Sequence, residues 1–409
     1  EANLPLYLDE ISSTLFGSAY KLANSPLSAA QLALSDFQQI ETGMREGHPG
    51  FVANNGRMGF DAQDYRAYAP EAASPVRLVW LAVHRSRASY SAIDGLDLNS
   101  YPPSMPLSGR ADWRPADGSK PGSDLAMVQR GAFDQLGASH AICNVVYGAQ
   151  AVFDSYMAAD FCKAINDWIA AEWLARDSRL RASIVVPIQA PDLAVEEIER
   201  RAGDNRFVSV LVPSQGEMLL GRRHYWPIYQ AAEKYRLPIA IHAGSAYRGA
   251  PSSIGWPSYR YEYYLAEAQA FQAQTLSLIY EGVFGKYPGL TVVLMESGVS
   301  WLPAFMWRAN KTWRGVRVEV PWVEREPAAI IREHFRVTMQ PFDAPLDATG
   351  VADIIDQIGS DKMFLFASDY PHWQFDGDDP VPPHLPKSLV QRMCEDNPLE
   401  TFPRLKLDA

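Results

Sequence analysis

Residues that can bind a metal ion or move a proton follow three apolar stretches of this chain. The run Met-Phe-Leu-Phe at 363–366 leads through Ala-Ser into Asp369, a proline turn and His372. Apolar runs likewise precede His242 and Glu296. Runs of this kind are typical of strands buried on both faces, and α/β enzymes keep their active sites at the carboxyl ends of such strands. We therefore expect Asp369, His242 and Glu296 to meet at one site.

These residue types suit a metal-assisted reaction. Imidazole nitrogen and carboxylate oxygen around an open coordination position fit one zinc or manganese ion, so His242, Glu296 and Asp369 are candidate ligands and catalytic groups. Asp369 is expected to be the least dispensable, because it can bind the ion and also carry a proton. Structural roles are the alternative: a core histidine for His242, a helix cap for Glu296 and a turn cap for Asp369.

Strand-like and helix-like segments alternate from residue 123 onward. Seven strands are predicted, each followed by a helix, at 139–146, 182–188, 207–212, 237–242, 290–296, 335–339 and 363–367. Ser123 is predicted to cap a helix that runs through Leu136, and another helix is predicted over 268–284. With an eighth strand from the first hundred residues, the pattern is that of a (β/α)8 TIM barrel. An open doubly wound sheet ranks second, because its Gly-rich phosphate turn is missing.

The first part of the chain is predicted to be an N-terminal extension or insertion, residues 1–95, that contains part of strand 1, with the barrel over 96–409. A helix is expected at 27–44 and either a strand or a short helix at 76–84. Residues 99–123 are rich in proline and glycine and predict a long ordered loop.

Composition limits the partners and the compartment. With 409 residues, 47% of them hydrophobic, the chain can bury a large core. The net charge of -11 and the lack of a Lys/Arg cluster argue against nucleic-acid and acidic-membrane partners. No apolar run of membrane-spanning length is present, and the scattered Cys143, Cys162 and Cys394 predict neither a disulfide framework nor a zinc knuckle. We expect a cytoplasmic homo-oligomer, a dimer.

The segment from Ser245 to Tyr264 is predicted to be an aromatic loop that covers the substrate. Its residues Trp256, Arg260 and Tyr261, together with His372, are the candidate substrate contacts. Aromatic walls with one arginine suit an aromatic or unsaturated carboxylate. We expect Arg260→Ala to raise KM for an anionic substrate, and an unchanged KM would count against the lid.

Three segments resemble the amidohydrolase-related family, in its aminocarboxymuconate-semialdehyde decarboxylase-like branch. They are Leu-Pro-Ile-Ala-Ile-His-Ala-Gly, Tyr-Pro-Gly-Leu-Thr-Val-Val-Leu-Met-Glu-Ser-Gly-Val-Ser-Trp-Leu-Pro and Phe-Ala-Ser-Asp-Tyr-Pro-His-Trp, within a similarity over residues 96–405. The resemblance implies a (β/α)8 barrel and one divalent metal, with His242 as the strand 5 ligand and Asp369 as the strand 8 ligand. Glu296 stands at the strand 6 position where many members have histidine.

The chain departs from this family at the first metal motif. A His-x-His pair is expected at the end of strand 1, and none of the eight histidines forms one. Three explanations remain open: strand 1 lies upstream of residue 1, residues 76–83 form it with His84 as a lone contributor, or the protein works without metal.

Two reactions and one non-catalytic role fit this pattern. The first is hydrolysis of a small amide, ester or lactone by metal-activated water. The alternative is non-oxidative decarboxylation of an aromatic or muconate-type carboxylic acid, which release of carbon dioxide would distinguish. The third is a metal-free lactonase or an inactive binding barrel.

Overall fold

The computed structural model describes residues 110–113, 115–116, 122, 124–146, 154–245, 255–257, 259–345, 347–372 and 379–408. The predictions for the extension at 1–95, the helix at 27–44, the eighth strand and His84 lie outside these residues, as does most of the loop at 99–123. Within the described part, no helix is long and apolar enough to cross a membrane.

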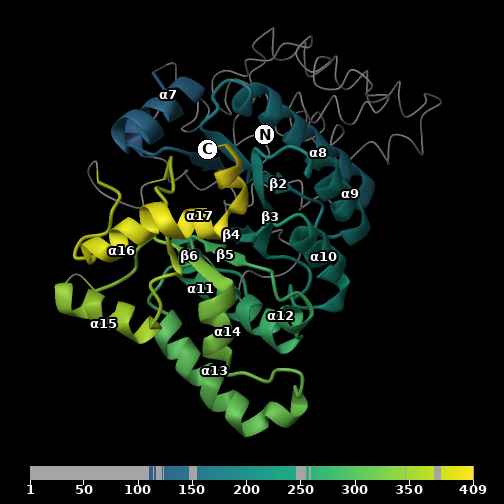
Figure 1. Cartoon of the computed structure of the whole chain (residues 1–409), viewed down its shortest axis with the longest axis vertical. Helices are drawn as coiled ribbons and strands as arrows, with labels where there is room; N and C mark the ends of the chain where they lie inside the picture. The colour runs from purple at the N-terminus through teal and green to yellow at the C-terminus, as the bar shows by residue number, and fades with distance from the viewer. Residues whose placement is uncertain are drawn as a thin grey trace, which may run out of the picture.

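Seven parallel strands form one sheet in the order of the sequence, and this confirms the seven strands predicted. Each strand pairs in parallel with the next along the chain, so every connection is a crossover to the neighbouring strand. The sheet curls, with helices on its outer side (Figure 1). The strands are β1 (Ala141–Cys143), β2 (Leu180–Val185), β3 (Phe207–Gln215), β4 (Ile239–Ser245), β5 (Val292–Met295), β6 (Phe335–Thr338) and β7 (Phe364–Leu365).

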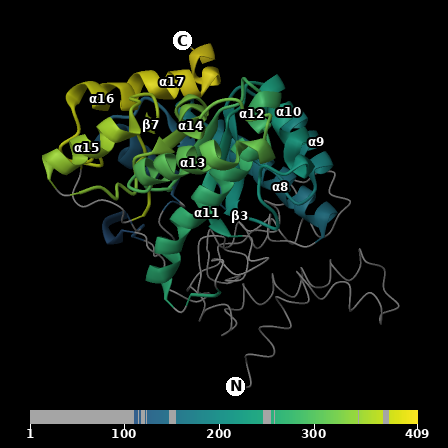
Figure 2. The same ribbon diagram turned by 90° about the horizontal axis from the view of Figure 1, so that it is seen from below.

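The helices alternate with the strands and supply the outer layer. Helices α8 to α10 cover one flank of the sheet and α13 to α17 the other (Figures 1 and 2). Their bounds are α7 (Leu125–Gln129), α8 (Ser155–Ile169), α9 (Pro191–Arg201), α10 (Trp226–Lys234), α11 (Arg260–Tyr280), α12 (Val283–Lys286), α13 (Leu302–Val316), α14 (Pro327–His334), α15 (Ala348–Ile358), α16 (Lys387–Gln391) and α17 (Asn397–Thr401).

The two faces of the strands have different partners. Leu180, Ala182 and Ile184 of β2 belong to the apolar core shared with the helices. The intervening Ser183 hydrogen-bonds across the sheet to Ser209 of β3 at 2.7 Å. Because side chains alternate along a strand, the apolar face packs under the helices and the polar residues line the concave face.

Two helix starts differ from the sequence-based prediction. Asp124, not Ser123, caps α7, and its carboxylate accepts from the Met127 N–H. The predicted loop at 245–264 is partly wrong, because its last residues form the first turn of α11 from Arg260 onward. Glu262 accepts the Tyr259 N–H at 2.8 Å and starts the helix there. The sequence-based prediction assigned the aromatic residues before 265 to a loop, and it therefore placed the start of this helix at residue 268.

Candidate active site

His242 lies in the middle of β4, just before the point where that strand contains one extra residue. Pro213 of β3 pairs with His242, but Gln215 pairs with Ser245, so the register slips between them. The ring Nδ1 of His242 lies 2.7 Å from the Ala243 carbonyl oxygen, which only accepts, so Nδ1 carries the proton of this bond. The other ring nitrogen, Nε2, lies 3.0 Å from Glu296 Oε1. His242 therefore makes both a bond to the backbone, as a core histidine does, and an ion pair with Glu296, a second candidate residue.

Glu296 occupies the turn that follows β5. Its backbone N–H donates to Thr338 Oγ1 on the neighbouring strand β6 at 3.1 Å. Asp343 holds the next part of the turn, because its carboxylate accepts from the backbone N–H of Val299 at 2.6 Å and of Ser300 at 3.1 Å. The helix that follows is capped at Trp301, so Glu296 is not its cap.

Asp369 follows β7 in a turn that its own side chain does not cap. Ser368 Oγ accepts the Tyr370 N–H at 3.2 Å, whereas Asp369 Oδ2 is buried without a hydrogen bond. His372 lies on the same turn, with its Nδ1 3.4 Å from Asp369 Oδ2. The Asp369 carboxylate is therefore presented to the site and not to the turn.

Both carboxylate residues adopt a left-handed backbone. The φ angle is 60° at Glu296 and 52° at Asp369, a region that residues other than glycine seldom occupy. Such conformations cost free energy of order 1–3 kcal/mol and gather at functional sites. Their occurrence at both strand ends supports a role beyond packing.

Residues near the start of the described chain support the Asp369 turn. Trp113 packs on Tyr370 with ring centroids 4.5 Å apart, and the Arg110 guanidinium lies 4.3 Å from the Trp113 centroid. The Arg110 N–H also donates to the Pro371 carbonyl at 2.9 Å. The sequence contains no periodic signal for this support, so it was not predicted.

Burial and mutual proximity shift the pKa values of these groups. Burial, together with the nearby Glu296 charge, raises the pKa of Asp369 to about 7. Burial alone would raise the pKa of Glu296, but the charge and hydrogen bond of His242 lower it to about 2. Burial alone would lower the pKa of His242, but Glu296 raises it to about 9. Near neutral pH, Glu296 and His242 form an ion pair and Asp369 exchanges its proton readily.

The arrangement fits a divalent cation. One ligand atom each from Glu296, Asp369 and His372 lie within 4.8 Å of one another. Asp369 Oδ2 and His372 Nδ1 are buried and lack hydrogen bonds, as expected of atoms that a cation would satisfy. Oxygen and nitrogen donors of this kind suit zinc or manganese.

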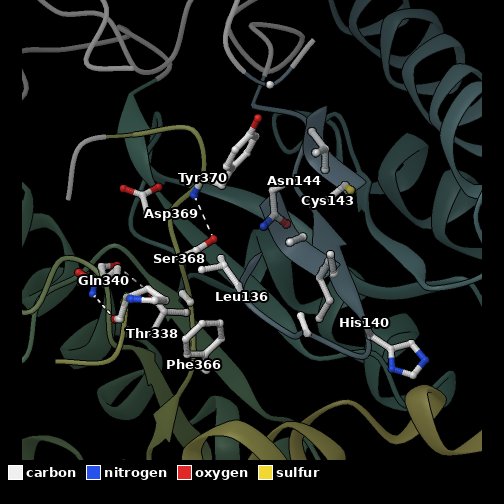
Figure 3. Close-up of a pocket in the computed structure, with 18 of the residues that line it drawn as sticks. Leu136, His140, Cys143, Asn144, Thr338, Gln340, Phe366, Ser368, Asp369 and Tyr370 are labelled. Atoms are coloured by element: carbon white, nitrogen blue, oxygen red, sulfur yellow. Dashed lines mark hydrogen bonds between the residues drawn. The ribbon is translucent and has the colours of Figure 1, made fainter. Parts of the chain in front are cut away.

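A cavity of about 1880 Å³ adjoins these residues. Its lining includes His242, Glu296, Asp369 and His372, and Figure 3 shows Asp369 and Tyr370 across the cavity from Asn144. Sequence reasoning had missed several polar lining residues at the ends of β1, β6 and β7, although the same strand-end position marks them: Asn144, Thr338, Gln340, Ser368 and Tyr370.

The predicted substrate contacts are only partly at this cavity. His372 lines it, whereas Trp256 is 51% exposed and is not among the described lining residues. Arg260 and Tyr261 lie in the first turn of α11. The cover over the substrate therefore stays a prediction.

Comparisons with known proteins point to one family and to a second, shorter similarity. The chain is 28% identical over 246 residues to gamma-resorcylate decarboxylase of Rhizobium sp. (strain MTP-10005), which is 56% of this chain and 70% of that protein. It is also 55% identical over 100 residues to putrebactin synthase of Shewanella sp. (strain MR-4), but this is 24% of the chain and only 16% of that protein.

The fold agrees with solved decarboxylase structures. The dihydroxybenzoic acid decarboxylase from Polaromonas sp. JS666, with bound manganese and the inhibitor 2-nitroresorcinol, superposes with a TM-score of 0.55 at 24% identity. The superposition covers 68% of this chain and 84% of that one. The predicted barrel fold class is thereby confirmed.

The family profile described as amidohydrolase matches residues 64–404. That match covers most of the chain, including all seven strands of the sheet and every candidate site residue. It confirms the predicted superfamily and the predicted enzyme class, a hydrolase or carboxy-lyase. The chain belongs to the amidohydrolase family.

Proposed function

We propose that this protein removes the carboxyl group of a phenolic carboxylic acid without oxidation, with the help of one divalent metal ion. The observation that carries this proposal is Asp369, a buried acid with a pKa near neutrality beside the candidate metal donors. Decarboxylation needs a proton donor at the ring carbon, and an acid with such a pKa can give and regain a proton. The decarboxylase names of its relatives support this reaction.

The metal would be held by His242, Glu296, Asp369 and His372, the four residues whose donor atoms converge. When bound, a divalent ion supplies positive charge that neutralises the substrate carboxylate and its neighbouring oxygen. Zinc and manganese both fit the donor set. The chain contains no His-x-His pair, so these four residues are the metal donors that the described part of the chain supplies.

The proton step belongs to Asp369. Because a bound ligand is ionised, Asp369 would first accept the proton of the substrate's phenolic hydroxyl and then donate it to the ring carbon that bears the carboxylate, as the bond from that carbon to the carboxyl carbon breaks. The phenolate oxygen that remains takes a proton from water. The electron pair of the broken bond stays on the ring, where it holds the new C–H bond, and carbon dioxide leaves. Asp369 is left as a carboxylate, as it was before the substrate bound.

The cavity suits an aromatic substrate. Apolar residues such as Leu136, Phe366 and Val293 can contact a ring, while the Asn144 amide and Ser368 hydroxyl can bind phenolic oxygens. Its volume of about 1880 Å³ admits a substituted benzoate with room to spare. The cavity can therefore also hold benzoates with further ring substituents.

The test is release of carbon dioxide. We expect the manganese-loaded protein to release it from hydroxybenzoates with a hydroxyl next to the carboxyl group, and the ring product to appear in equal amount. Benzoate without that hydroxyl is the matched control, because its ring carbon is less basic. Turnover of lactones or amides with no carbon dioxide from any hydroxybenzoate would overturn the proposal.

Hydrolysis of a small amide, ester or lactone is the second candidate. The same pKa of about 7 lets ionised Asp369 accept a proton from an attacking water. The assay above separates the two reactions, since only decarboxylation releases carbon dioxide. The predicted dimer and the metal-free alternatives stay predictions.

A prediction concerns the turn that carries Glu296. Asp343→Ala removes the acceptor of the Val299 and Ser300 N–H groups, so we expect a stability loss of about 1 kcal/mol, as for other lost caps, and weaker manganese binding. Asp347→Ala is the matched control, because Asp347 caps α15 through the Gly350 N–H. It should lose similar stability and keep its manganese affinity. Calorimetric titration measures the manganese affinity of each variant, and thermal melting measures its stability. Equal manganese affinities in the two variants would contradict the role of Asp343 in placing Glu296.

A further inference from the structure

The end of β4 that follows His242 is held by a buried residue outside the proposed active site. Gly244, two residues after His242, has a φ of 136° and lies within the register slip between β3 and β4. Its carbonyl lies 3.1 Å from Ser214 Oγ on β3. This hydroxyl therefore adds a side-chain contact between the two strands at the register slip that follows His242.

Two side chains of helix α11, on the same face of the helix, contact Ser214 through hydrogen bonds. Gln274 donates its Nε2 to the Ser214 carbonyl at 2.7 Å, and Glu267 Oε2 lies 3.0 Å from Ser214 Oγ. Glu267 and Gln274 are seven residues apart and so share one face of the helix. Ser214, Glu267 and Gln274 are all buried. The end of β3 is thus hydrogen-bonded to α11 at a position buried from solvent.

The number of protons in this chain of contacts constrains the state of Glu267, because Ser214 Oγ lies within donating distance of both the Gly244 carbonyl and Glu267 Oε2. A serine hydroxyl has one proton, and a carbonyl oxygen only accepts. If Ser214 donates to the Gly244 carbonyl, the contact between Ser214 Oγ and Glu267 needs a proton from Glu267. A neutral acid also suits the surroundings, because burial raises its pKa, the Glu296 charge raises it further, and Oε1 has no hydrogen bond of good geometry. Tyr263, Ser214 and Gln215 oppose this shift.

We infer that Glu267 is a positioning residue, a protonated acid that donates to Ser214 and thereby holds the Gly244 carbonyl and the end of β4 that follows His242 in place. The chain of contacts runs from Glu267 through Ser214 to the Gly244 carbonyl. Gly244 follows Ala243, whose carbonyl accepts the bond from His242 Nδ1. Glu267 does not touch the proposed metal donors. Its effect on metal binding rests on the proposed function.

The experiment compares Glu267→Gln with Glu267→Ala in the full chain. The glutamine amide can still donate to Ser214 Oγ, whereas alanine cannot. We expect Glu267→Ala to weaken manganese affinity by about 10- to 100-fold, as losses behind a ligand typically do, and Glu267→Gln to stay close to wild type. Glu262→Gln is the matched control, since it makes the same change on the exposed first turn of α11.

Two spectroscopic readouts need no metal. Apart from the band of half-protonated Asp369, the infrared spectrum at neutral pH should contain the C=O stretch of a second protonated carboxylic acid, which Glu267→Gln lacks and which Glu262→Gln and Asp369→Asn keep. The Nδ1–H proton of His242 should be protected from exchange in wild type and Glu267→Gln, and exchange faster in Glu267→Ala. Ser214→Ala should show the same loss of manganese affinity and the same faster exchange as Glu267→Ala. It replaces Glu267→Ala in these measurements if that variant does not fold.

The outcomes separate this inference from the proposed function. If wild type binds no manganese, the proposed metal site fails and the two spectra still decide the role of Glu267. If the second infrared band is absent, or if Glu267→Gln behaves like Glu267→Ala, or if Glu267→Ala leaves both the affinity and the His242 proton unchanged, the positioning role is wrong.

Discussion

Asp369→Asn is expected to lower kcat for carbon dioxide release by about 10² to 10⁴, the range typical of general acid–base groups, with the fold intact. The amide keeps the shape of the side chain but cannot carry the acidic proton. The loss should be in kcat more than in KM, because the proton is needed in the transition state and not for binding. Steady-state kinetics with a hydroxybenzoate at saturating manganese measures it.

The matched control for this variant is Asp353→Asn on α15, which makes the same change at an exposed position. It should leave both kcat and KM unchanged. Near-normal kcat in a folded Asp369→Asn protein would show that Asp369 is only a turn residue. The site would then have to be reassigned around His242 and Glu296.

Removal of the divalent ion should abolish turnover, and addition of manganese or zinc should restore it. The four donor side chains place two carboxylates and two imidazoles together, and without a cation they leave Asp369 Oδ2 and His372 Nδ1 unsatisfied. Dialysis against a chelator followed by metal analysis and a carbon dioxide assay tests this. Full release of carbon dioxide by protein that metal analysis shows to be metal-free would contradict the proposed metal dependence.

Metal affinity should fall as the pH is lowered, because bound ligands must be deprotonated. The pKa of about 7 at Asp369 and about 9 at His242 mean that both groups lose protons when the ion binds near neutrality, whereas Glu296, with a pKa of about 2, is already ionised. At pH 7 nearly all of His242 is protonated, and Asp369 and His372 are partly protonated because their pKa values are raised as well, so binding should release at least one proton. Titration calorimetry in two buffers of different ionisation enthalpy measures this number, and a value near zero would contradict it.

The sequence by itself determined the strands and the residues that follow them. Apolar runs of strand length predicted all seven strands of the sheet, because burial on both faces demands such runs. The position directly after a run then identified His242, Glu296 and Asp369, which the structure brings together. The reason is geometric, since the ends of parallel strands share one edge of the sheet.

The tertiary structure alone decided what surrounds these residues. Thr338 binds the Glu296 N–H from a strand 42 positions away, and Ser214 meets Glu267 across 53 positions. Periodicity reports whether a position is buried, but partners on separate elements depend on register and on the curl of the sheet. The pKa of about 7 at Asp369 arises in the same way, because it needs the burial and the Glu296 charge that only the assembled strand ends provide.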